Sequence, residues 1–144
     1  MANNGKWLEK LVEKGLKEFQ EAQPSFYHRF YDSAAAGGFL PTQPGDYLWL
    51  VPSSPAILLE VKSTEKSAPL KSLIKPAQVG KHKLWMRAGH LSAFIYGDSC
   101  TDILRWHWGS YVLLGNEKAA ICSAFSGTTS DISQMLKKVA TTHN

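Results

Sequence analysis

The pattern of apolar positions predicts a helix near each end of the chain. In residues 5–21 the apolar side chains recur three or four positions apart, as in an amphipathic helix, and Gln23-Pro24 ends the pattern. Residues 131–139 repeat this spacing, and Asp131-x-x-Gln134 is a helix-capping pattern. The two apolar stripes consist of Leu8, Leu11, Val12, Leu16 and Phe19, and of Ile132, Met135, Leu136 and Val139. We therefore expect each helix to bury one face.

Short apolar and aromatic runs between these helices predict β-strands. They cover residues 26–31, 47–51, 56–62, 91–96, 102–108 and 110–114. The run at 56–62 is apolar almost throughout, which is typical of a central strand. Residues 34–38 (AAAGG) predict a flexible connection and residues 52–55 (PSSP) a turn. Pro76 begins a further predicted helix that runs to residue 88, with Gly89 as its C-cap.

The order of these elements is helix, three strands, helix, strands, helix. This order predicts an α/β sandwich with a central mixed β-sheet flanked by helices. Three strands form an antiparallel meander, and a helical crossover then leads to a parallel neighbour. The chain has 144 residues, of which 44% are hydrophobic. That is the size of one domain, residues 1–144, with enough apolar side chains for a core.

Composition and spacing disfavour several classes of protein. No apolar run approaches the roughly 20 residues of a membrane-spanning helix, and the charged N-terminus has no secretory h-region. Cys100 and Cys122 have no metal spacing, and two thiols in an unsecreted domain are expected to be reduced. We therefore expect a cytoplasmic protein that is not membrane-bound, not a redox scaffold and not a zinc finger.

The candidate chemistry lies where the predicted central strand ends in Glu60-Val61-Lys62. Residues two apart on a strand face the same side, so Glu60 and Lys62 project together. Charges at the end of an apolar strand cost desolvation energy unless they are paired or bind a metal. A solvated ion pair at the strand end is the simpler alternative. Asp46, which begins the preceding strand, is by itself also typical of an Asx turn.

The length of the hairpin loop decides whether Asp46 reaches Glu60. A four-residue loop, residues 52–55, places Asp46 opposite Val61, with its side chain on the other face of the sheet. A three-residue loop, residues 52–54, places Asp46 opposite Glu60 on the same face. A joint site therefore requires an odd loop, a bulge or a bent strand near Asp46. Two carboxylates and a nearby backbone carbonyl would suit Mg²⁺, which ligates phosphate oxygens and lowers the pKa of bound water.

These residues resemble the motif of the PD-(D/E)XK nuclease superfamily. Pro44-x-Asp46 followed by Glu60-x-Lys62 is similar to the superfamily's central motif, although Gly45 separates the proline from the aspartate. The resemblance implies a restriction-endonuclease-like fold and a metal-dependent endonuclease.

Two further residues match in order and in element type. Gly5-x-x-x-Glu9 resembles the helix-borne glutamate of the superfamily, and Gln78 matches the glutamine on the helix after the central motif. The combination resembles Holliday junction resolvases of the archaeal and RecU-like kind, found in prokaryotes and their phages. It covers residues 5–96, and the chain after Tyr96 carries no motif of the family.

The resemblance implies roles for the matching residues. Lys62 would stabilise the transition state, and Gln78 would position water or the scissile phosphate. The cofactor would be Mg²⁺, with Mn²⁺ able to substitute. The implied metal ligands are Asp46, Glu60, the Val61 carbonyl, and Glu9 either directly or through water.

The implied reaction is hydrolysis of a DNA phosphodiester that leaves 5′-phosphate and 3′-hydroxyl ends, with a four-way junction as the substrate. Two symmetric nicks need two sites, which predicts a C₂ homodimer. A nuclease core does not encode its substrate. A nickase, a replication or repair nuclease and a restriction-like enzyme therefore stay open, as does a non-catalytic nucleic-acid-binding module of the same fold.

Positive charge gathers directly after the candidate metal ligands. The net charge is only +4, but residues 62–87 hold seven Lys and Arg residues against Glu65 alone. This favours a phosphate backbone across the site, with a solvated loop as the alternative. The candidates for DNA contact are Lys66, Lys71, Lys75, Lys81 and His82, although His82 alone is more typical of a polar helix flank. The alternating Trp106 and Trp108 favour a core or a dimer interface over base stacking.

Overall fold

The computed structural model describes residues 6–31, 43–114 and 124–141. Its strands are β1 (Phe26–Arg29), β2 (Tyr47–Leu50), β3 (Ile57–Thr64), β4 (Leu91–Asp98), β5 (Ile103–Trp108) and β6 (Phe125–Gly127). Its helices are α1 (Lys6–Ala22), α2 (Leu70–Leu73), α3 (Pro76–Arg87), α4 (Gly109–Leu114) and α6 (Ile132–Thr141), the last preceded by a 3₁₀ turn, η1 (Thr129–Asp131). The predicted connection at 34–38, Gly5 and Cys122 lie outside the described residues.

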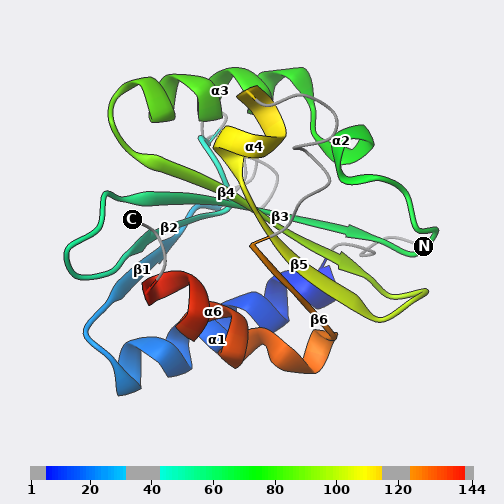
Figure 1. Cartoon of the computed structure of the whole chain (residues 1–144), viewed down its shortest axis with the longest axis horizontal. Helices are drawn as coiled ribbons and strands as arrows, with labels where there is room; N and C mark the ends of the chain where they lie inside the picture. Colours follow the sequence, from blue (N-terminus) through cyan, green and yellow to red (C-terminus); the bar gives the residue numbers. More distant parts are fainter. Residues whose placement is uncertain (1–5, 32–42, 115–123, 142–144) are drawn as a thin grey trace.

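The strands form one mixed sheet in the order β1-β2-β3-β4-β5-β6 (Figure 1). The first three strands pair antiparallel, β3 and β4 pair parallel, and β5 and β6 again pair antiparallel to their neighbours. Helices α2 and α3 form the crossover between β3 and β4. The predicted fold class, a meander followed by a helical crossover within an α/β sandwich, is therefore confirmed.

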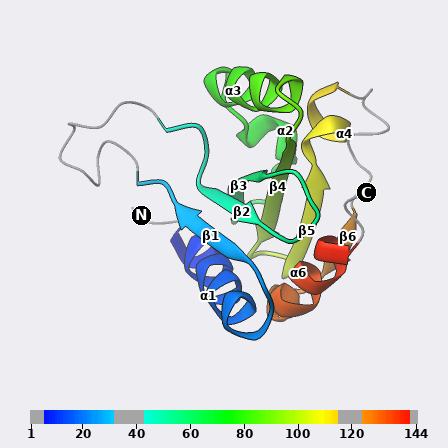
Figure 2. The ribbon, with the colours of Figure 1, turned by 90° about the vertical axis from the view of Figure 1, so that its left-hand side faces the viewer.

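Helices cover both faces of the sheet. Helices α1 and α6 lie side by side on one face, whereas α3 and α4 lie on the other (Figures 1 and 2). The larger core lies between the sheet and the α1–α6 layer, and its fully buried members include Leu8, Val12, Leu16, Trp49, Leu59, Trp106 and Met135. The predicted stripes of both terminal helices thus face this core. Trp106 belongs to the core, as its spacing favoured.

Two local predictions are wrong. Residues 110–114 form the helix α4 rather than a strand, because burial there follows a helical period, with Gly109 and Val112 buried and Tyr111 and Leu114 exposed. Packing against β4 and β5 overrides the β-propensity of this short apolar run. The capping pattern near the C-terminus also begins earlier than expected, since Thr128 and Asp131 form the reciprocal cap. No helix among the described residues is long and apolar enough to cross a membrane.

Candidate active site

Asp46 lies directly before β2 and is held there by three hydrogen bonds. Its backbone N–H donates to the Leu59 carbonyl (2.9 Å), and its carbonyl accepts from the Phe30 N–H (2.9 Å). Its carboxylate Oδ2 accepts the Val61 N–H at 2.7 Å. The register that pairs Tyr47 with Leu59 is the one that a three-residue loop requires. Regular pairing with β3 ends at Tyr47, and the backbone bends at Asp46, because its N–H bonds to Leu59 on one side and its carbonyl to Phe30 on the other. The sequence left two registers open, and the chain adopts the one that brings the two carboxylates together.

Gly45 explains how the chain tolerates a residue between the motif's proline and aspartate. A β-carbon at this position would lie 2.9 Å from Leu58 Cδ1 and 3.1 Å from the Leu59 carbonyl oxygen. Those distances are shorter than ordinary van der Waals contact, and one of the two atoms belongs to the backbone. Glycine therefore allows the segment to lie close against β3, and this approach places Asp46 beside the middle of that strand. The strand continues to Thr64, so the prediction that it ends at Lys62 is wrong.

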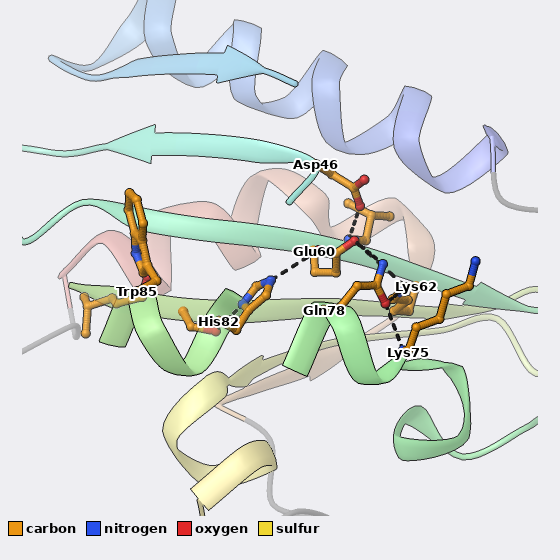
Figure 3. A network of polar contacts seen from close by, with 10 residues as sticks. Asp46, Glu60, Lys62, Lys75, Gln78, His82 and Trp85 are labelled. Atoms are coloured by element: carbon orange, nitrogen blue, oxygen red, sulfur yellow. Dashed lines mark hydrogen bonds and ion pairs between the residues drawn. The ribbon is translucent and has the colours of Figure 1, made fainter. Parts of the chain in front are cut away.

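Glu60 points away from the larger core, toward α3. The residue is only 3% exposed, and both carboxylate oxygens have partners. Oε2 accepts the Gln78 Nε2–H at 3.1 Å and lies 3.9 Å from Lys62 Nζ. Oε1 lies 3.2 Å from His82 Nε2. Gln78 and His82 are one turn apart on α3, so one face of this helix contacts both oxygens of Glu60 (Figure 3).

Lys62 is held beside Glu60 by the first turn of α3. Its Nζ donates to Gln78 Oε1 at 2.7 Å. The same amide oxygen accepts the Lys75 backbone N–H at 3.0 Å, which caps the helix whose first residue is Pro76. Gln78 therefore ties the helix N-terminus to two charged side chains of β3, and Lys62 is the cation fixed nearest to the carboxylates.

The electrostatics of the pair are unfavourable without a cation. Burial, and then the charge of Glu60, raise the pKa of Asp46 to about 7, against the lowering effect of the Val61 N–H. Burial likewise raises the pKa of Glu60 to about 7, although Lys62 opposes the shift. The pair therefore favours holding a proton near neutral pH, and a bound cation is the natural replacement for that proton.

The donor set suits Mg²⁺. Two carboxylates supply hard oxygen ligands, and Mg²⁺ is commonly held by one or two carboxylates while it keeps several waters. Among the described residues no three acidic, His or Cys side chains converge to hold one ion. Glu9 on α1 is half-buried, and its charge acts on Glu60. The geometry thus favours the expected contribution of Glu9 through water over direct ligation.

The remaining predicted residues fall into two groups. Lys66, Lys71 and Lys75 are exposed and Lys81 is partly buried, so their surface positions are compatible with DNA contact. His82 is fully buried, which is incompatible with the predicted contact to DNA, and its ring instead bonds to Glu60. The sequence reasoning missed Ser92, whose Oγ lies 2.6 Å from His82 Nδ1. The one feature of the sequence that could have identified Ser92 is that it is a hydroxyl residue within the apolar run of β4.

Comparison with known proteins supports the fold. No protein-family model and no curated protein matches the sequence. A solved structure that does match is Archaeoglobus fulgidus Hjc, a Holliday junction resolvase from an archaeal hyperthermophile, at 17% sequence identity and a TM-score of 0.55. The match covers 92% of this chain and 98% of the resolvase chain. The chain therefore shares, over nearly its whole length, the mixed-sheet fold of an archaeal Holliday junction resolvase.

Proposed function

We propose that this protein is a Mg²⁺-dependent DNA endonuclease that cleaves branched DNA, with the four-way junction as its substrate. The observation that carries the proposal is the convergence of Asp46, Glu60 and Lys62 in the interior of β3, just past the last residue that β2 pairs with. A resolvase fold over 92% of the chain gives this arrangement a matching scaffold. The buried, mutually repelling carboxylates have no structural purpose that apolar residues would not serve better.

The residues present have distinct roles in phosphodiester hydrolysis. Asp46, Glu60 and the Val61 carbonyl would hold Mg²⁺, which supplies electrophilic activation of the phosphate and a more acidic water. The water loses a proton as its oxygen bonds to phosphorus, the bond to the 3′ oxygen breaks, and that oxygen takes up a proton. Lys62, held by Gln78 at 2.7 Å, is a preorganised positive charge for the negative charge that develops on the phosphate.

The basic segment, residues 62–87, is proposed to contact the phosphate backbone of the DNA. Residues 62–87 carry seven Lys and Arg residues against one acidic residue, and they include Lys62 itself together with α2 and α3. The exposed lysines on this segment are suited to phosphate contacts, which position DNA without reading its sequence. We propose a homodimer, because two symmetric nicks in a four-way junction require two sites related by a two-fold axis.

Cleavage of three labelled substrates tests the proposal. A synthetic four-way junction, a linear duplex of the same sequence and a flap are incubated with the protein in Mg²⁺, Mn²⁺ or EDTA. We expect paired, symmetric nicks in the junction that need a divalent cation, and far slower cutting of the duplex. Asp46→Asn and Glu60→Gln are expected to bind the junction in a gel-shift assay without cutting it.

Each other outcome points to a different function. Equal cutting of linear duplex would contradict junction selectivity and favour a general or restriction-like nuclease. Preferred cutting of the flap would favour a repair nuclease. Junction binding without any cleavage by the wild type in Mg²⁺ or Mn²⁺ would contradict catalysis and favour a binding module. A monomer at micromolar concentration in analytical ultracentrifugation, with and without junction, would contradict the dimer.

A further inference from the structure

His82 and Ser92 form a buried polar pair behind Glu60 that no step of the proposed hydrolysis uses. His82 Nδ1 lies 2.6 Å from Ser92 Oγ, and His82 Nε2 lies 3.2 Å from Glu60 Oε1. His82 is fully buried and Ser92 is 2% exposed. A buried row of polar groups is costly unless every group has a hydrogen-bond partner, and here each group has one. The last of these hydrogen bonds is made to a carboxylate oxygen of the candidate metal site, on Glu60.

The packing around the pair restricts its movement. The His82 ring stacks on Phe94, with ring centroids 4.7 Å apart and planes 26° apart. Phe94 lies opposite Glu60 in the parallel register of β3 and β4, and Ser92 lies two residues earlier on the same face. Behind Ser92, a β-carbon on Gly109 would lie 2.1 Å from the Ser92 hydroxyl oxygen. The absence of a side chain at Gly109 therefore leaves the space that the serine hydroxyl occupies.

We propose that His82, oriented by Ser92, is a positioning residue that fixes the Glu60 carboxylate for cation binding. This inference rests on the proposed function, because it assigns His82 a role toward the same metal site. The hydroxyl of Ser92 donates to Nδ1, and the neutral ring then carries its proton on Nε2 and donates it to Glu60 Oε1. Gln78 meanwhile donates to Oε2. The carboxylate is thus held at both oxygens from one side, which leaves their remaining lone pairs to a cation.

Substitutions at His82 separate the hydrogen bond from the packing. The amide of His82→Gln reaches about as far as Nε2 and retains a donor to Glu60, whereas the amide of His82→Asn reaches only about as far as Nδ1. His82→Phe keeps a ring against Phe94 but has no donor. His28→Gln is the control, because His28 is an exposed histidine on β1, two strands from Glu60.

The first readout is the affinity of the DNA-free protein for Mn²⁺, measured by electron paramagnetic resonance. We expect His82→Phe and His82→Asn to weaken Mn²⁺ affinity about tenfold, as loss of a partner behind a metal ligand typically does. His82→Gln is expected to stay within about threefold of the wild type, and the control His28→Gln to bind like the wild type. Thermal unfolding of each variant in EDTA separates a fold defect from a weakened site.

The second readout is the tautomer of His82 in the metal-free protein at pH 9, from ¹⁵N–¹H correlation spectra of the imidazole. We expect the Nε2–H tautomer in the wild type and a mixture of tautomers in Ser92→Ala. A Nδ1–H tautomer in the wild type would overturn the inference, as would wild-type Mn²⁺ affinity in a folded His82→Phe. Absence of Mn²⁺ binding by the wild type would instead overturn the proposed metal site, and the inference with it.

Discussion

Asp46→Asn tests whether ionised carboxylates in the metal-free site lower the stability of the folded protein. The pKa of Asp46 lies at about 7 instead of 3.8, because burial and the neighbouring Glu60 disfavour its ionised form. A carboxyl pKa raised by about three pH units costs the folded state about 4 kcal/mol once the pH exceeds both values. The pair shares this cost, since one proton between the carboxyls relieves both, so we expect about half of it, about 2 kcal/mol, from the substitution.

The size of the effect depends on pH. Well below pH 3.8 the Asp46 carboxyl holds its proton in both the folded and the unfolded state, and it contributes no difference. As the pH rises from about 4 to about 7, the unfolded chain releases this proton while the folded state retains it, so the stability of the wild type falls. Above about pH 7 the full cost persists. Asparagine cannot ionise, and its amide can donate to Glu60, so Asp46→Asn escapes the cost.

Urea unfolding in EDTA, followed by tryptophan fluorescence, measures the effect. Trp49 and Trp106 are fully buried reporters. We expect Asp46→Asn to be more stable than the wild type by about 2 kcal/mol at pH 8 and to lie within about 0.5 kcal/mol of it at pH 4. Mg²⁺ should reduce the stability difference between the two proteins at pH 8, because it binds and stabilises the folded wild type more than the variant, which lacks one of the two carboxylates.

A second aspartate provides the matched control. Asp98 ends β4 and accepts hydrogen bonds from Ser67 Oγ (2.7 Å) and the Cys100 N–H (2.9 Å), which lower its pKa. Asp98→Asn should therefore destabilise the protein at pH 8. If Asp46→Asn is no more stable than the wild type at pH 8, or if its gain persists at pH 4, the electrostatic reasoning is wrong.

Three further predictions concern catalysis, DNA binding and packing. Lys62→Met should slow single-turnover junction cleavage by about 10²–10³-fold while gel-shift affinity changes only a few-fold, and a larger loss of affinity than of rate would contradict its catalytic role. Lys71→Gln and Lys75→Gln should each lower the slope of log affinity against log salt by about one, and unchanged slopes would place the DNA elsewhere. In thermal unfolding, Gly97→Ala should destabilise, because its β-carbon would lie 2.7 Å from Leu8 Cδ2, whereas Gly80→Ala, with no atom within 4 Å, should stabilise by about 0.5–1 kcal/mol; equal effects would refute the packing argument.

The architecture was predictable because its elements have strong periodicities. The apolar stripes of α1 and α6 and the continuous apolar run of β3 determine which faces are buried, and the position of α3 between β3 and β4 requires a crossover. The short segment 109–114 was not predictable in this way. Its aromatic and branched residues favour a strand locally, and only its packing onto β4 and β5 selects the helix.

The candidate site was predictable in its members but not in its geometry. The pattern Glu60-x-Lys62 placed two charges on one face, but the approach of Asp46 to Glu60 depends on the register of β2 on β3 and on the bend of the backbone at Asp46. The role of His82 depends on the parallel register of β3 and β4 and on the hydroxyl of Ser92. The spacing of residues along the sequence reveals neither the register nor the contact with Ser92, so a polar position on the flank of a helix was the simpler interpretation of His82.

Asp46 and Glu60 are proposed to hold the cation of a nuclease centre together. Crystals soaked in Mn²⁺ test this proposal most directly, since anomalous diffraction at the manganese absorption edge locates the ion without reference to any assumed ligand. We predict one strong anomalous peak in contact with carboxylate oxygens of both residues and with the Val61 carbonyl. A peak that contacts neither carboxylate, or no peak at a Mn²⁺ concentration that supports cleavage, would contradict the account.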